Sequence, residues 1–86
     1  MTFQIEIKPE AIKDLQRLDR KIIKQIKEKL EQIKPNPARH LKWINRYNVF
    51  CLRVGDHRIF IDLDANKKLI SILTIRHRNK AYRGWK

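Results

Sequence analysis

Val49-Phe50-Cys51-Leu52-Arg53-Val54-Gly55-Asp56-His57-Arg58 is the stretch that decides the fold, because it contains a strand, a tight turn and the start of a returning strand. Side chains alternate along residues 49–54, so Phe50, Leu52 and Val54 should point to one face of a sheet. Val49, Cys51 and Arg53 should point to the other face. Gly55-Asp56 is typical of a short hairpin turn. The stretch therefore predicts the centre of an antiparallel sheet.

The segments after and before this hairpin extend the sheet. His57 to Leu63 forms the returning strand, Asp64-Ala65-Asn66-Lys67 the next turn, and Lys68 to Arg76 the last strand. At the start of the chain, Thr2 to Ile7 also alternates and predicts a half-buried strand. Residues 38–48 show no clear period and are expected to form a loop or an irregular strand, in which Trp43 is expected to plug a small core.

Two helices are predicted between the first strand and this irregular segment. Pro9 and Glu10 suit the start of a short helix. Asp19 is expected to cap a second helix from Arg20 to Lys34, which Pro35-Asn36-Pro37 should end. The second helix has a clear apolar stripe, formed by Ile22, Ile23, Ile26, Leu30 and Ile33.

These elements predict one α+β domain over residues 1–86, in the order β-α-α-β-β-β. We expect a two-helix hairpin packed on one face of a small, mainly antiparallel four-stranded sheet. The face opposite the helices would then be left for function, with Arg53 on it.

Charge narrows the class of partner. The 86 residues carry a formal net charge of +12. All acids fall in residues 1–31 and 56–64, so the segments 32–55 and 65–86 are acid-free. A bland explanation is a lysine-rich surface that keeps the protein soluble, but arginines concentrated in strands favour binding to a polyanion. Nucleic acid, an acidic protein and, less often, a membrane surface are such partners.

Other features exclude several classes of site. The single cysteine, Cys51, excludes an internal disulfide and a cysteine-based zinc site, and a packed strand cysteine is not expected to act as a nucleophile. The three histidines match no zinc-ligand spacing, so neither a metal nor another cofactor is expected. No apolar run approaches twenty residues, which predicts a soluble, cytoplasmic protein with no membrane partner.

Two motifs carry a resemblance. Leu52-Arg53-Val54-Gly55-Asp56-His57-Arg58 and His77-Arg78-Asn79-Lys80-Ala81-Tyr82-Arg83 together resemble the RelE/ParE superfamily of bacterial and archaeal toxins. The family pattern is roughly L-R-x-G-[DS]-[YH]-R, followed after another strand by [GR]-H-R-x-x-x-Y-R. Each motif alone is weak, but both occur in order in a short basic chain, and size, charge and element order match over nearly its whole length. The histidine-arginine-tyrosine ending looks more like the RelE branch than the ParE branch.

The resemblance implies a ribosome-dependent endoribonuclease that cuts mRNA in the A site by attack of the 2′-hydroxyl, without a metal. It also implies a cognate antitoxin with an acidic or amphipathic helical segment. Arg58 matches the hairpin arginine that binds the scissile phosphate, Arg76 the arginine ending the last strand, and Tyr82 the C-terminal tyrosine that stacks on RNA. With His77 these form the expected catalytic set. The expected RNA-binding set is Lys42, Arg53, His57, Arg78, Lys80 and Arg83.

The chain departs from the pattern on one strand. The best-known RelE branch has two lysines before the hairpin, where this chain has Val49 and Cys51. Lys42, in the preceding segment, is a candidate substitute. His57 stands where tyrosine is commoner.

The chemistry supports the same residues independently. RNA cleavage by its own 2′-hydroxyl needs a proton acceptor, a proton donor and stabilisation of the phosphorane charge. Arginines suit the last, because the guanidinium matches two phosphate oxygens. His57, His77, Tyr82 and, more distantly, His40 are the candidates for proton transfer, whereas Asp56 is expected to form the turn.

Three functions remain open at this point. The first is the mRNA endoribonuclease, which we favour. A ParE-like inhibitor of DNA gyrase would share the fold and cut nothing. An inactive homologue that only binds antitoxin or RNA would explain the missing strand lysines.

Overall fold

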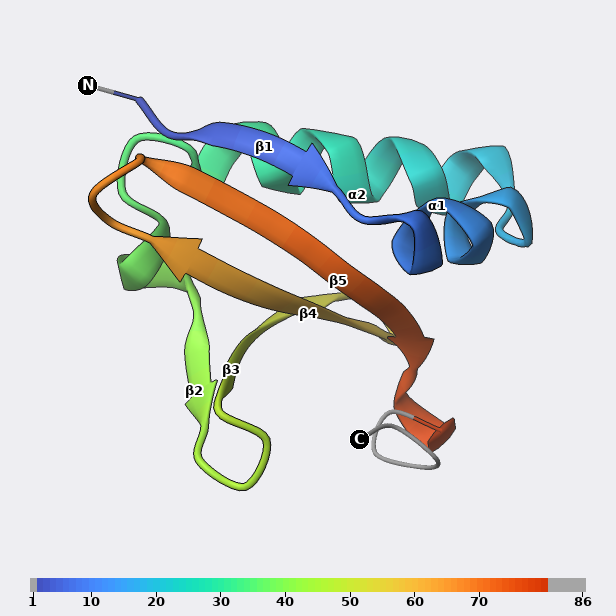
Figure 1. Cartoon of the computed structure of the whole chain (residues 1–86). Helices are drawn as coiled ribbons and strands as arrows, with labels where there is room; N and C mark the ends of the chain where they lie inside the picture. The colour runs from blue at the N-terminus through green and yellow to red at the C-terminus, as the bar shows by residue number, and fades with distance from the viewer. Residues whose placement is uncertain (1, 81–86) are drawn as a thin grey trace.

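The computed structural model describes residues 2–80 and confirms the α+β class (Figure 1). Both helices lie on one side of a twisted sheet. In chain order the elements are β1 (Gln4–Ile7), α1 (Pro9–Gln16), α2 (Arg20–Ile33), the 3-10 helix η1 (Pro37–His40), β2 (Lys42–Ile44), β3 (Val49–Val54), β4 (His57–Asp64), β5 (Leu69–His77) and the 3-10 helix η2 (Arg78–Lys80).

The sheet has five strands instead of the expected four, in the order β1-β5-β4-β3-β2. β1 runs parallel to β5, and the other neighbours are antiparallel. The additional strand is β2, three residues long, which pairs with β3 so that Lys42 lies opposite Cys51. A strand this short has no alternation to detect, and it forms because β3 offers it a hydrogen-bonding edge.

Trp43 on β2 does not plug the core as expected. Its side chain is 48% exposed. The ring packs edge-on against Phe50, with 4.9 Å between the ring centroids. This contact covers Phe50 at the sheet edge and leaves much of the indole in solvent.

The helices begin and end close to the predicted positions. Pro9 occupies the first turn of α1, and Asp19 is the N-cap residue of α2. Asp19 therefore has the predicted position, but its carboxylate makes no capping hydrogen bond to the backbone of α2. α2 ends at Ile33, one residue before the predicted end, because Pro35 and Pro37 cannot continue a helix.

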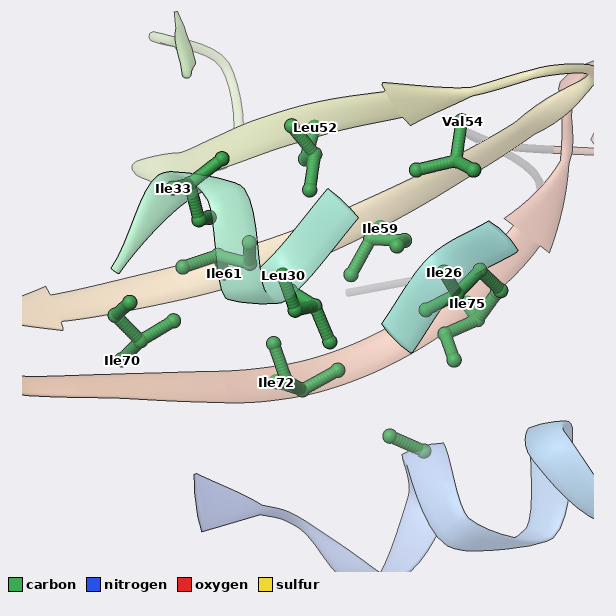
Figure 2. Close-up of a cluster of buried hydrophobic side chains, with 11 residues drawn as sticks. Ile26, Leu30, Ile33, Leu52, Val54, Ile59, Ile61, Ile70, Ile72 and Ile75 are labelled. Carbon is green, nitrogen blue, oxygen red and sulfur yellow. The ribbon is translucent and has the colours of Figure 1, made fainter. Parts of the chain in front are cut away.

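The main core lies between the helices and the sheet (Figure 2). The stripe on α2 supplies Ile26, Leu30 and Ile33, which meet Leu52 and Val54 of β3, as the alternation predicted. Each fully buried aliphatic side chain contributes roughly 1.5–3 kcal/mol. The buried residues of this core are Ala11, Ile26, Leu30, Ile33, Leu52, Val54, Ile59, Ile61, Ile70, Ile72 and Ile75.

The opposite face is not uniformly open. Val49, Cys51 and Phe60 form a second buried cluster there, with Ile44, Tyr47 and Leu73 packed partly against it. Val49 and Cys51 therefore point away from the helices, as predicted, but they fill a small core of their own. At the end of the sheet near the Gly55 turn, this face carries the side chains of Arg53 and Arg58.

A bulge interrupts the pairing of β4 with β5. Phe60 lies opposite Thr74, but its neighbour Ile61 lies opposite Ile72, so Leu73 is an extra residue on β5. β1 covers only residues 69–72 of the outer edge of β5. Beyond that point Asp14 of α1 takes over, and its Oδ2 accepts a hydrogen bond from the Ile75 N–H at 2.9 Å. This carboxylate ties α1 to the uncovered edge.

Candidate nucleic-acid interface

Three arginines lie in one cross-strand row. Arg53 on β3 is directly opposite Arg58 on β4, and Arg58 is directly opposite Arg76 on β5. Like charges at opposed positions of a sheet are destabilising. We call this set the arginine row. It unites, in one register, three residues that the two sequence motifs singled out.

The first two members of the row, Arg53 and Arg58, have no acid partner among the described residues. The side-chain ion pairs of the described residues include Lys8–Glu6, Lys34–Glu31 and Arg78–Asp56. None includes Arg53 or Arg58. Asp62, a conceivable partner for Arg53, lies opposite Ser71 instead, towards the far end of β4. Two neighbouring cations, Arg53 and Arg58, that have no acid partner among the described residues are suited to an external anion.

A hollow lies beside the row on the face away from the helices. It is lined by Lys42, Ile44, Cys51, Arg53 and Arg58, and we call it the lysine hollow. The Nε of Arg58 is buried and has no hydrogen-bond partner in the described part of the chain. A buried charged donor without an acceptor is costly. A phosphate oxygen in the lysine hollow would satisfy it.

Lys42, whose position could not be predicted from the sequence, lines the lysine hollow. Lys42 lies opposite Cys51, one of the two positions where the RelE branch carries a strand lysine. Burial raises the pKa of the Cys51 thiol, and the nearby charges of Arg58, Arg53 and Lys42 only partly oppose this. The thiol is therefore neutral at pH 7, and Lys42 and the arginines supply the positive charge of the hollow.

A pair of histidines lies at the next position along β4 and β5. His57 is directly opposite His77, and their rings meet edge to face, with centroids 5.4 Å apart. Burial and then the charge of His77 lower the pKa of His57, against a smaller opposing effect of Asp56. His57 is therefore neutral at pH 7. The Nδ1 of His77 accepts a hydrogen bond from the Asn79 N–H at 3.3 Å.

The histidines line a second hollow, beside α1, which we call the histidine hollow. Side chains alternate along a strand, so His57 and His77 point to the opposite face from Arg58. Arg76 reaches this hollow from the part of β5 that β1 leaves uncovered. Its lining residues are Glu10, Asp14, Arg17, Leu18, His57, Ile75, Arg76 and His77.

The expected catalytic set is thus divided. Arg58 lines the lysine hollow, whereas Arg76 and His77 line the histidine hollow, and the arginine row connects the two. Glu10 and Arg17 were not foreseen, because α1 and β5 are about sixty residues apart and no sequence pattern links them. Tyr82 and Arg83 lie outside the described residues.

The remaining predicted residues follow β5. The Nη1 of Arg78 lies 3.9 Å from the Asp56 Oδ1, and both side chains are largely exposed. Exposed pairs of this kind contribute little. Lys80 ends η2. The backbone oxygen of Asp56 also accepts a hydrogen bond from the Arg78 N–H at 2.7 Å. This bond connects the turn to the residue that follows β5.

Two kinds of feature are absent from residues 2–80. The structure brings together no group of three or more histidine, cysteine or acidic side chains that could hold a metal ion there. None of the helices in that part of the chain is long and apolar enough to cross a membrane.

Solved structures share this fold. The toxin–antitoxin complex RelBE2 from Mycobacterium tuberculosis contains a chain with a TM-score of 0.83 and 23% identity, covering 91% of this chain and 100% of that one. A chain of the archaeal RelE–RelB complex from Pyrococcus horikoshii OT3 has a TM-score of 0.77 and 22% identity, covering 94% and 100%. A chain of the RelB–RelE complex from Methanococcus jannaschii has a TM-score of 0.70 and 24% identity, covering 93% of this chain and 98% of that one.

Sequence comparison supplies the family. No curated protein sequence matches the chain. The model of a protein family described as the ParE toxin of type II toxin–antitoxin systems, parDE, matches residues 5–82. This match includes the first motif, the second motif as far as Tyr82, both α-helices and every strand except the first residue of β1. The chain therefore belongs to the ParE toxin family of type II toxin–antitoxin systems, within the RelE/ParE superfamily, and its fold is RelE-like.

Proposed function

We propose that this toxin is a metal-independent endoribonuclease that cleaves mRNA in the ribosomal A site and thereby inhibits translation. The observation that carries the proposal is the buried, unpartnered Nε of Arg58 in the arginine row beside Lys42. A site of this kind fits a phosphodiester better than a neutral ligand. The two sequence motifs that resemble the superfamily supply the residues of the row.

The arginines would stabilise the reacting phosphate. In the reaction the 2′-oxygen bonds to phosphorus, and the bond from phosphorus to the 5′-oxygen breaks, which leaves a 2′,3′-cyclic phosphate. Negative charge builds on the phosphorane oxygens between these steps. A planar guanidinium donates two parallel hydrogen bonds to such oxygens. Arg58 is the strongest candidate, because its buried Nε has no partner among the described residues and a bound anion would supply one.

The histidine hollow would supply proton transfer only to a phosphate that Arg76 also contacts, because His57 and His77 point to the opposite face of the sheet from Arg58. One group must take the proton of the 2′-hydroxyl, and another must give a proton to the departing 5′-oxygen. The lowered pKa of His57 keeps its ring neutral and able to accept a proton at pH 7. His77 is less suited to this role than its motif implied, because its Nδ1 lone pair already accepts the Asn79 N–H. Tyr82 stays a candidate for proton transfer, as the sequence motif indicated.

The partners follow from charge and relatives. The chain carries a formal net charge of +12, and several similar structures are described as complexes of RelE with RelB. We propose a cognate antitoxin that covers the basic surface with an acidic or amphipathic helical segment. The ribosome and its mRNA are the proposed targets, and the cytoplasm is the proposed location.

Primer extension on translated mRNA tests the activity. Expression of the toxin should arrest growth and produce cuts at A-site codons, and co-expression of the antitoxin should prevent both. Arg58→Ala should abolish the cuts, whereas Lys24→Ala, on the exposed face of α2, should leave them unchanged. Growth arrest without any cuts would refute the nuclease.

Inhibition of DNA gyrase is the second candidate, because the matching family model describes ParE toxins. A supercoiling assay with purified gyrase separates the two functions. Loss of supercoiling at stoichiometric toxin, with intact mRNA in the cell, would favour gyrase. A folded wild-type protein without effect in either assay would indicate an inactive homologue, as the Val49 and Cys51 positions suggested.

A further inference from the structure

The hydroxyl of Thr74 lies between a carboxylate and an arginine. Thr74 is fully buried, at the bulge of β5. Its Oγ1 donates a hydrogen bond to the Asp14 Oδ2 at 2.8 Å. The same Oγ1 accepts one from the Arg76 Nε at 3.4 Å. These contacts connect α1, through the edge of the sheet, to the last member of the arginine row.

We infer that Asp14 and Thr74 are positioning residues that orient the Arg76 guanidinium towards phosphate. The inference rests on the proposed function for its catalytic consequence, but not for its geometry. A hydroxyl that donates to a carboxylate becomes a better acceptor, because hydrogen bonds in a chain polarise one another. Thr74 thereby holds the Nε side of the guanidinium, and the plane of the group is fixed with respect to the strand.

Fixing this plane matters because arginine is flexible. A free arginine side chain has many rotamers, and ordering them on substrate binding weakens the interaction. Thr74 is β-branched and buried, so its own χ1 is restricted, and Asp14 is held by its second bond to the Ile75 N–H. The support is therefore rigid before any substrate arrives.

A purely structural role is the rival explanation, since the Asp14–Thr74 contact also fastens α1 to β5. The two explanations differ in how they depend on Arg76. If Thr74 acts through Arg76, its loss has no effect once Arg76 is gone. If it only stabilises the fold, its loss adds to that of Arg76.

The variants separate these cases. Thr74→Val preserves the branched shape and removes both hydrogen bonds, and Thr74→Ser keeps the hydroxyl as the matched control. We expect Thr74→Val to lower kcat for RNA cleavage by about 10-fold or more with little change in KM, and Thr74→Ser to remain near the wild type. Arg76→Ala combined with Thr74→Val should equal Arg76→Ala alone. Multiplicative losses in the double variant would overturn the inference.

A second measurement does not depend on activity. The Nε–Hε group of Arg76 gives an NMR signal that can be assigned by its loss in Arg76→Lys. Its exchange with water should quicken markedly in Thr74→Val and in Asp14→Ala, and remain slow in Thr74→Ser. Unchanged exchange in the folded variants overturns the inference. If exchange responds as expected while wild-type toxin cuts no RNA, the positioning stands and the proposed nuclease fails.

Should Thr74→Val fail to fold, Asp14→Asn provides the same test. The amide oxygen can still accept from the Ile75 N–H, but it lacks the negative charge that polarises the Thr74 hydroxyl. We expect an intermediate exchange rate for the Arg76 Nε–Hε and an intermediate kcat. Values equal to the wild type in both measurements would overturn the role of the carboxylate.

Discussion

Arg58 lies directly opposite Arg76 across β4 and β5, and the Nε of Arg58 is buried without a partner in residues 2–80. Opposed like charges and an unsatisfied buried donor both cost stability. The fold retains them at the one end of the sheet where its two sequence motifs meet. Function and stability should therefore respond in opposite directions when this position changes.

Arg58→Met tests that opposition. The variant keeps an unbranched chain of similar length and removes both the unpaired donor and the repulsion, so the free energy of unfolding should rise by roughly 0.5–1 kcal/mol. RNA cleavage should fall about 10²–10³-fold, as for loss of one donor to a developing anion. Denaturant unfolding and primer extension measure the two effects. Lys24→Met, on the exposed face of α2, is the control, and a destabilised Arg58→Met would contradict our account of the row.

Lys42→Gln tests the substitute for the missing strand lysines. Lys42 lines the lysine hollow with Arg53 and Arg58, so its charge should contribute to RNA binding. We expect the slope of log affinity against log salt to decrease by about one in magnitude. Titration of the toxin with a short RNA at several salt concentrations gives the slope. Lys67→Gln, in the turn before β5, should leave it as in the wild type. Equal slopes for both variants would remove Lys42 from the interface.

His57 predicts a pH dependence of stability. Its pKa is lowered in the folded state, chiefly by burial and then by His77. The unfolded state therefore binds more protons near the ordinary histidine pKa of about 6.5, and the free energy of unfolding must fall as the pH drops below that value. Above it, both states are neutral at His57 and the contribution is fully present.

His57→Gln should flatten this dependence between about pH 5 and pH 7. Chemical unfolding at several pH values measures it, and His40→Gln, in the exposed 3-10 helix η1, serves as the control. A slope for His57→Gln as steep as that of the wild type would place the titrating group elsewhere.

Two isoleucines on the helices should differ in the stability that is lost when each is replaced by alanine. Ile33 is completely buried beneath the sheet, whereas Ile12 on α1 is 45% exposed. Ile33→Ala should lower the free energy of unfolding by about 2–5 kcal/mol. Ile12→Ala should cost well under half of that, because much of its side chain already contacts water. Thermal or denaturant unfolding of both variants checks the difference, and equal losses would contradict the core in Figure 2.

Much of the fold was accessible from local patterns. The alternation of residues 49–54 predicted which side of β3 joins the helices, and the stripe Ile26, Leu30, Ile33 predicted the face of α2 that they meet. These signals suffice because burial imposes a period of two on strands and about 3.6 on helices. The same patterns could not reveal β2, which is too short to show a period, or the exposure of Trp43.

The site was predicted only in part, because its geometry depends on contacts between distant segments. Motif resemblance indicated Arg58, Arg76 and His77, and the register of the sheet brought the two arginines together. No local pattern shows that His77 lies on the other face of the sheet from Arg58. The carboxylate of Asp14 meets Thr74 across 60 positions in the chain, and only the folded protein reveals that pair.

The bulge at Leu73 sets the parity of β5. Ile70 and Ile72 face the helices, and strict alternation would send Arg76 to that side and Ile75 to the other. One extra residue reverses the count, so Ile75 joins the core and Arg76 comes into line with Arg58. Deleting Leu73 would remove the bulge and restore regular pairing, with Phe60 still opposite Thr74 and Ile61 still opposite Ile72, so Ile75 and Arg76 would keep their faces. In related toxins, a one-residue gap at this point would therefore mark the loss of the bulge and not a change of the surface that carries Arg76.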